Sequence, residues 1–263
     1  MPTLEVRGVE LAWSERGEGR PVLLIHETAA TGEVWGPVAE ALAEGSRAIV
    51  YDRRGWGRSS APDDHRRTTV EEQSEDAGVL AESVVDEPVA VCGAGTGAVV
   101  ALDLILRRAD LVSAAVLVEP PLLQLLPTAT ETLSEDRRRL EGAVAAGHDL
   151  IDLYLSGGLP ALGAGAGRLP EEVAAAARER PASVIAELGI AAGWRMPLSR
   201  LGSAERPTAI VLSASTPALV RAASEALADR LAASSTREVV SAAAPPHVGA
   251  PGEVAALALE LSS

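Results

Sequence analysis

The chain has 263 residues, of which 47% are hydrophobic, so it can form one large α/β domain or two small ones with a substantial core. A net charge of −14 without a basic patch makes nucleic acid and anionic membranes poor candidate partners. Cys92 is the only cysteine, which excludes an internal disulfide and argues against a thiolate metal site. The first residues lack the features of a secretion signal, and no apolar run reaches the ~20 residues of a membrane span, so we expect a cytoplasmic protein.

The first half of the chain alternates apolar runs with helical patterns. Strands are predicted over residues 4–13, 21–25, 47–51, 88–92 and 114–118. Helices are predicted from near residue 36, over 69–84 and over 96–108. Pro37 suits the first turn of the first of these helices, and Thr68 or Thr69 can cap the second. Strands that alternate with helices at this spacing predict a mostly parallel sheet covered on both faces.

The strand pattern disappears between residues 124 and 200 and returns afterwards. Helical patterns fill that region at residues 134–146, 148–155, 170–179 and 183–192, with a glycine-rich stretch at 157–167. Strands follow at 208–213 and 237–241, and helices at 217–232 and 253–261. We therefore expect residues 1–123 and 201–263 to form an α/β core and residues 124–200 to form a helical cap over it.

A glycine-rich turn joins the strand at 88–92 to the helix at 96–108, and two unrelated kinds of site share this arrangement. A dinucleotide-binding fingerprint G-x-G-x-x-G/A is matched by Gly93, Gly95 and Ala98, and Glu119 lies near the position of the acid that holds the ribose. However, two β/α units precede these glycines, whereas the fingerprint normally opens its fold. The nucleotide interpretation also leaves His247 without a role.

The other interpretation is a nucleophile elbow, G-x-S-x-G, which Gly93 and Gly97 frame but in which Gly95 occupies the serine position. It accounts for more of the chain, because other motifs lie around it in order. A strand before it ends at His26, and the next strand leads into the charged loop 52–59. Glu119-Pro-Pro and a late Pro-Pro-His ending at His247 come after it.

This order of motifs resembles the α/β-hydrolase superfamily over nearly the whole length of the chain. The resemblance implies an α/β-hydrolase fold, a mostly parallel sheet flanked by helices with a helical cap insertion. It also implies that His247 is the general base and that Glu119 orients it, because residues 213–216 after the next strand include no carboxylate. We also expect His26, Thr28, Gly95 and Thr96 to line the substrate pocket, and Asp52 and Arg53 to be structural rather than catalytic.

Two residues depart from the pattern of this superfamily. Gly95 has no group that could attack a substrate, so the sequence as it stands excludes an acyl-enzyme mechanism. Glu27 follows the strand-ending histidine, where relatives often have glycine and where a carboxylate would oppose a developing oxyanion. Glu27 could therefore serve as a catalytic acid or base, or be a loop residue that is solvated or paired with an arginine.

We therefore expect a non-covalent, cofactor-independent enzyme, without a metal, that acts on an apolar small molecule. A base without a nucleophile suits cyclisation, C–C bond chemistry, elimination or water-mediated hydrolysis, and Gly95 is expected to leave space for a bulky, flat substrate. The absence of Phe, Lys and Asn is typical of a GC-rich genome, and by analogy suggests natural-product biosynthesis. Two alternatives stay open: a serine esterase whose nucleophile was replaced by Gly95, and a ligand-binding pseudoenzyme. The oligomeric state is not predicted.

Overall fold

A computed structural model describes residues 1–163 and 165–262 of the chain. In these residues eight strands form one sheet in the order β1-β2-β4-β3-β5-β6-β7-β8. Their bounds are β1 Thr3–Val6, β2 Val9–Arg16, β3 Pro21–Ile25, β4 Arg47–Tyr51, β5 Val89–Ala94, β6 Val112–Val118, β7 Thr208–Ser213 and β8 Ser234–Val239. β2 pairs antiparallel with β1 and β4, and the remaining neighbours are parallel. The predicted mostly parallel sheet is confirmed.

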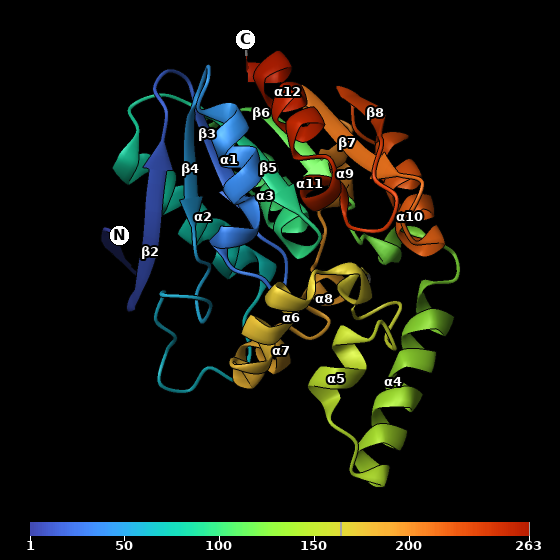
Figure 1. Ribbon diagram of the computed structural model, residues 1–263. Coiled ribbons are helices and arrows are strands. Elements are labelled where there is room, and N and C mark those ends of the chain that lie inside the picture. The colour runs from blue at the N-terminus through green and yellow to red at the C-terminus, as the bar shows by residue number, and fades with distance from the viewer. Residues whose placement is uncertain (164, 263) are drawn as a thin grey trace.

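Helices cover both faces of this sheet (Figure 1). The helices outside the region between β6 and β7 are η1 Gly32–Trp35, α1 Gly36–Leu42, α2 Val70–Val84, α3 Thr96–Arg107, α10 Ala218–Ala228, α11 Pro246–Gly249 and α12 Pro251–Ser262. Thr69 caps α2 by accepting a hydrogen bond from the backbone N–H of Glu72, as the sequence predicted for one of the two threonines.

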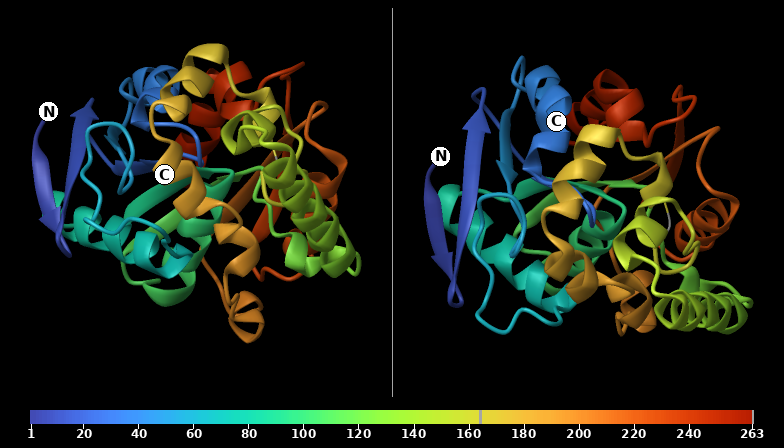
Figure 2. Two further views of the ribbon diagram at one scale, coloured as in Figure 1. Left: turned by 90° about the horizontal axis from the view of Figure 1, so that it is seen from below. Right: turned by 60° about the horizontal axis from the view of Figure 1, so that its bottom comes forward.

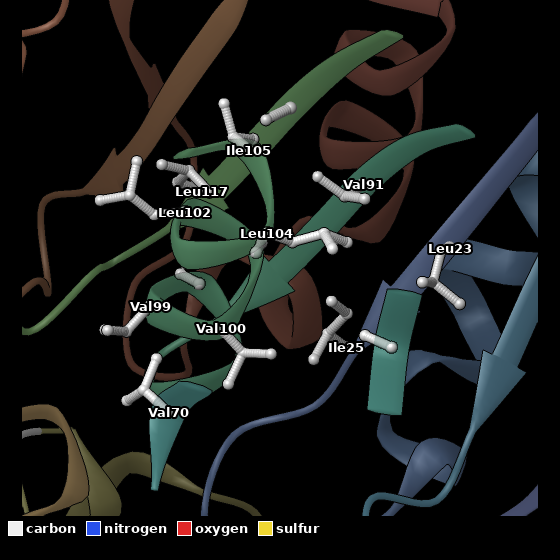
Figure 3. Close-up of a cluster of buried hydrophobic side chains, with 14 of the residues drawn as sticks. Leu23, Ile25, Val70, Val91, Val99, Val100, Leu102, Leu104, Ile105 and Leu117 are labelled. Atoms are coloured by element: carbon white, nitrogen blue, oxygen red, sulfur yellow. The ribbon is translucent and has the colours of Figure 1, made fainter. Parts of the chain in front are cut away.

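Strand β3 shows why its sequence is continuously apolar. Val22 and Leu24 pack into a buried cluster with α1 and α12, whereas Leu23 and Ile25 pack into another with α2 and α3. Side chains alternate between the two faces of a strand, so a strand covered by helices on both faces is apolar at every position. Figure 3 shows the second cluster, in which side chains from β3 and β5 lie against those of α3.

All elements described between β6 and β7 are helical. They are η2 Leu123–Leu125, α4 Ala129–Ala146, α5 Leu150–Leu155, η3 Ala166–Arg168, α6 Glu171–Arg178, α7 Pro181–Glu187, α8 Ile190–Gly193 and α9 Leu198–Leu201. Helices α4 to α8 lie across one end of the sheet, away from the β1–β2 hairpin (Figure 2). Trp56 and Ala29 of the core pack with Ile151 and Val184 of this region, which we call the cap. No helix in the described residues is long and apolar enough to cross a membrane.

Two elements differ from the sequence-based expectation because of single backbone positions. The strand expected at 4–13 is a hairpin of β1 and β2, since Arg7 and Gly8 both adopt positive φ and turn the chain. The helix expected at 183–192 is divided into α7 and α8 at Gly189, which has a φ of 76°. Neither change moves the residues of the candidate site from the expected ends of their strands.

Candidate active site

A small cavity lies at the carboxyl ends of the central strands, where the cap covers the sheet. Its volume is about 30 Å³, which is enough for one or two water molecules. Apolar or glycine positions form most of its wall: Ala94, Gly95, Val118, Gly165, Ala166, Leu169, Val220 and Pro245. The polar side chains that line it are Glu27, Thr28, Thr96, Glu119, Tyr154 and His247. Apart from His26, every residue expected to act at the site therefore meets in this cavity.

The turn between β5 and α3 has the tight geometry of a nucleophile elbow. Gly95 adopts φ 51° and ψ −119°, a conformation that side-chain-bearing residues rarely take. A Cβ atom added at Gly93 would lie 2.3 Å from the carbonyl oxygen of Gly97, and one at Gly97 would lie 2.2 Å from that of Ile25. These two glycines are required because helix α3 approaches strands β5 and β3 too closely for any side chain.

Glu27 lies against the elbow, at the place where a residue with a side chain would project. A Cβ atom added at Gly95 would lie 3.0 Å from the Glu27 Cβ, closer than ordinary van der Waals contact. The space that we expected Gly95 to leave for a bulky substrate is therefore filled in part by Glu27. That expectation was wrong because it considered the missing serine without the neighbouring loop.

The carboxylate of Glu27 also makes the nearest polar contact of His247. Glu27 Oε1 lies 3.2 Å from His247 Nε2, and both side chains are buried. Burial raises the pKa of Glu27, but the interactions with His247 and the Arg53 guanidinium outweigh it, so the pKa lies below its usual value. The Glu27 carboxylate is therefore held ionised beside the imidazole, which packs on Trp35 at a ring-centroid distance of 4.8 Å.

Glu119 has other partners than the one that the sequence suggested. Its Oε2 accepts a hydrogen bond from Arg168 Nη1 at 2.6 Å, and its Oε1 accepts one from Thr216 Oγ1 at 2.6 Å. Arg168 comes from the cap and also donates to Ser215 Oγ and to the carbonyl oxygen of Ala244. This corrects the expected orienting role: both Glu119 oxygens are engaged elsewhere, and the carboxylate that contacts His247 is that of Glu27.

His26 is not placed to bind a substrate, which corrects a second expectation. Its Nδ1 donates to the carbonyl oxygen of Glu27 at 2.8 Å, and its Nε2 accepts from the backbone N–H of Arg53 at 2.9 Å. Burial, together with the charge of Arg53, holds the pKa of His26 well below its usual value. A neutral imidazole with both nitrogens occupied fixes the loop after β3, and thereby the position of Glu27.

Thr28 and Thr96 line the cavity as expected and are joined to each other. Their hydroxyl groups share a hydrogen bond of 2.9 Å, and Thr28 Oγ1 donates to Glu187 Oε2 at 2.6 Å. Glu187 belongs to helix α7 of the cap and is fully buried among core residues. The cap carboxylate therefore holds Thr28 directly and Thr96 only through Thr28.

Three cap residues at or near the site were missed in the sequence: Tyr154, Arg168 and Glu187. Tyr154 lines the cavity from α5, and burial raises the pKa of its hydroxyl above the usual range. The two adjacent arginines of the loop after β4 need acidic partners when they are buried. This need was the one indication of Glu187 that the sequence contained. The sequence holds 37 acidic residues, so that requirement could not identify which one it was.

Asp52 and Arg53 have the structural roles that the sequence suggested. The carboxylate of Asp52 accepts hydrogen bonds from the backbone N–H groups of Gly32 and Arg58, at 2.8 and 2.9 Å. Arg53 is buried and paired with Glu187. Both residues therefore shape the loop below the cavity without lining it.

Comparison with known proteins agrees with this fold. The model of the alpha/beta hydrolase family matches residues 22–257, and the chain belongs to this family. The uncharacterized hydrolase YraK of Bacillus subtilis is 36% identical over 124 residues, which make up 47% of this chain and 46% of YraK. The match thus spans about half the length of that relative.

Solved structures resemble the chain over its full length. An alpha/beta hydrolase from Sphaerobacter thermophilus superposes with a TM-score of 0.72 at 22% identity, covering 100% of both chains. The enol-lactonase from Burkholderia xenovorans superposes with a TM-score of 0.70 at 19% identity, covering 99% of both. At such identities these likenesses establish the α/β-hydrolase fold.

Proposed function

We propose that this protein is a cofactor-independent enzyme that carries out proton-transfer chemistry on a neutral, apolar small molecule, with His247 as base and without a covalent intermediate. One observation carries the proposal. The elbow residue, Gly95, has no side chain, yet His247 lines the same cavity with an ionised carboxylate beside it. A base without a nucleophile can still abstract a proton or activate water.

The cavity wall supports an apolar reactant. Ala94, Val118, Leu169 and Val220 contribute only hydrocarbon, so the site favours a molecule that has few charges of its own. Cyclisation, elimination, C–C bond chemistry and water-mediated hydrolysis all satisfy this description. We propose an intermediate of natural-product biosynthesis as the substrate, by analogy with the altered site on a hydrolase scaffold.

The small volume implies that the cap moves when a substrate binds. A cavity of about 30 Å³ is smaller than the several hundred Å³ typical of sites for drug-sized ligands. Gly165, Ala166 and Leu169, in and around η3, line the cavity. Displacement of η3 would enlarge the site without disturbing the sheet.

The crowding at the elbow weighs against the alternative of a serine esterase that has lost its nucleophile. A serine at position 95 would require Glu27 to move by a few tenths of an ångström, because its Cβ would lie 3.0 Å from that of Glu27. A glutamate that crowds the nucleophile and pairs with its base is not an arrangement that suits serine catalysis.

The test is a screen of neutral esters, lactones and enolisable ketones, with products followed by mass spectrometry. We expect turnover by the wild type without any covalent adduct, reduced about 10²-fold or more in His247→Gln. The matched control is His148→Gln, since His148 is exposed in the cap and should leave turnover unchanged. Unchanged turnover in His247→Gln, or an acyl adduct on the wild type, would contradict the proposal, and tight binding without product would favour a pseudoenzyme.

A further inference from the structure

Glu27 and Gly95 are in close contact, and the side chain of Glu27 packs against the elbow residue that has no side chain. The Glu27 side chain packs where a side chain at position 95 would begin. Its Oε1 stands 3.2 Å from His247 Nε2, the atom that would otherwise face a nucleophile on the elbow. Glu27, from the loop after β3, therefore lies against the elbow with its carboxylate beside His247.

The surroundings of this carboxylate leave it short of hydrogen-bond donors. Apart from the contact with His247, neither oxygen of Glu27 has a hydrogen-bond partner within the described part of the chain. Buried polar atoms are nearly always satisfied, and unsatisfied ones in a cavity indicate that a ligand or water completes them. Glu27 is one of the residues that line the cavity, and both of its carboxylate oxygens are buried, so a molecule that binds when the cap moves can supply the missing donor.

We propose that Glu27 is a catalytic residue, the proton acceptor that touches the substrate in place of the elbow side chain. This inference rests on the proposed proton-transfer function, and it transfers the role of base from His247 to Glu27. In the step, a proton leaves an O–H or activated C–H of the ligand and arrives on the Glu27 carboxylate, while the electron pair stays on the ligand. His247 holds the carboxylate in place through Oε1, which leaves Oε2 for the ligand. No oxidant, reductant or further reactant is needed.

The charges around the cavity define the class of ligand. Glu27 and Glu119 are the acidic groups that line it, and the Arg168 guanidinium near Glu119 is engaged with that carboxylate, Ser215 and the Ala244 carbonyl. Arg53 is paired with Glu187 outside the lining. Within the described residues, no arginine side chain lines the cavity, and the two carboxylates that do line it oppose an anionic ligand. The ligand is therefore a neutral molecule with an acidic hydrogen, and not a carboxylate or phosphate.

A first experiment tests whether Glu27 takes up the space of a side chain at position 95. It requires no knowledge of the natural substrate. Gly95→Ser and the double variant Glu27→Gly/Gly95→Ser are treated with a fluorophosphonate that reacts with activated serines, and labelling is followed by intact mass. We expect the double variant to be labelled at least tenfold faster than Gly95→Ser, because removal of Glu27 vacates the space beside the serine. Wild type and Glu27→Gly should stay unlabelled.

Either of two results from this experiment would overturn the inference. Equal labelling of Gly95→Ser and the double variant would show that Glu27 does not occupy the position of the nucleophile. A double variant that is folded by circular dichroism yet unreactive would show that the space beside His247 is not that of the elbow side chain.

A second experiment tests the proton acceptor with 5-nitrobenzisoxazole, a flat, neutral probe. Loss of its C–H proton to a base forms the nitrile, breaks the N–O bond and releases a coloured cyanophenolate. We expect the wild type to exceed free acetate at equal concentration, and Glu27→Gln, which keeps the shape but not the basicity, to lose at least 100-fold. Glu27→Asp should restore part of the rate. Benzyl alcohol should inhibit and benzoate should not; the reverse order would overturn the ligand class.

The same probe separates failure of this inference from failure of the proposed function. If Glu27→Gln retains the wild-type rate while His247→Gln loses it, His247 is the base and the role given to Glu27 is wrong. If both variants retain the rate, or the wild type does not exceed acetate, the proton-transfer function itself is wrong at this site.

Discussion

Glu187 of helix α7 accepts hydrogen bonds from both terminal nitrogens of Arg53, at 2.8 and 2.9 Å, and so joins the cap to the loop after β4. Trp56 Nε1 and Gln73 Nε2 also donate to its Oε1, each at 2.8 Å. Although burial alone raises the pKa of Glu187, the charge of Arg53 and hydrogen bonds from Arg53, Thr28 and Gln73 outweigh it, and the net pKa lies below the usual value. A single cap carboxylate thus holds the floor of the active site together.

Substitution Glu187→Gln should therefore destabilise the fold strongly. It leaves the Arg53 guanidinium buried without its counter-charge, which costs about 3–5 kcal/mol of unfolding free energy. Urea unfolding followed by circular dichroism measures this. The control is Glu141→Gln, since Glu141 pairs with Arg137 at 2.9 Å on the exposed surface of α4 and should change stability by about 0.5 kcal/mol or less. A similar effect of both substitutions would contradict the structural role of Glu187.

Alanine at Gly93 should be poorly tolerated, whereas alanine at Gly142 should not. The added Cβ at Gly93 would meet the backbone of Gly97 at 2.3 Å, which forces α3 away from β5 and costs at least about 2 kcal/mol. Gly142 lies on an exposed face of α4 with no atom within 4 Å of an added Cβ, and alanine there should stabilise by about 0.5–1 kcal/mol. Thermal unfolding of the two variants measures whether the first substitution lowers the stability and the second raises it.

Removal of His247 should raise the pKa of Glu27. In His247→Gln the effect of burial is no longer opposed by the imidazole, so the carboxylate takes up its proton at a higher pH than in the wild type. Carbon-detected NMR of labelled glutamate, with Glu27→Gln to assign the resonance, measures this titration. An unchanged midpoint would show that His247 does not act on Glu27.

The same pair gives stability a defined pH dependence. A carboxyl whose pKa is lowered on folding stabilises the protein above its unfolded pKa of about 4.3, and this contribution is lost as the pH falls through the folded pKa. The stability advantage of the wild type over His247→Gln should therefore shrink on acidification below about pH 4.3. Urea unfolding of both proteins across the acid range measures this difference in stability. A difference that grows on acidification would contradict the prediction.

Arg168→Gln should loosen the part of the cap that closes the cavity. The guanidinium joins η3 to Glu119, Ser215 and the Ala244 carbonyl, and each charge-assisted hydrogen bond contributes about 1.5–3 kcal/mol. Amide hydrogen exchange in residues 165–169 should become at least about tenfold faster. Arg178→Gln is the control, because Arg178 contacts Asp152 and Glu171 within the cap and should leave that segment unchanged.

Local sequence determined much of the fold. Strands β3, β4 and β7 have the bounds that their apolar runs predicted, and α1 begins at Gly36 because Pro37 suits a first helical turn. These features depend on residues only a few positions apart. The elbow is similarly local, since its strand, glycine turn and helix are consecutive. The chain order of the motifs then sufficed to predict the parallel sheet and the convergence of Gly95 and His247.

Tertiary structure decided which charged groups pair at the site. Glu119 is engaged by Arg168, which is 49 positions away, so it does not contact His247, and Glu27 does. Such pairings depend on side-chain direction and on how closely the cap approaches the sheet. The order of motifs specifies neither. Motif order therefore predicted that Gly95 and His247 line one cavity, whereas only the packed structure determined that Glu27 lies against Gly95 and beside His247.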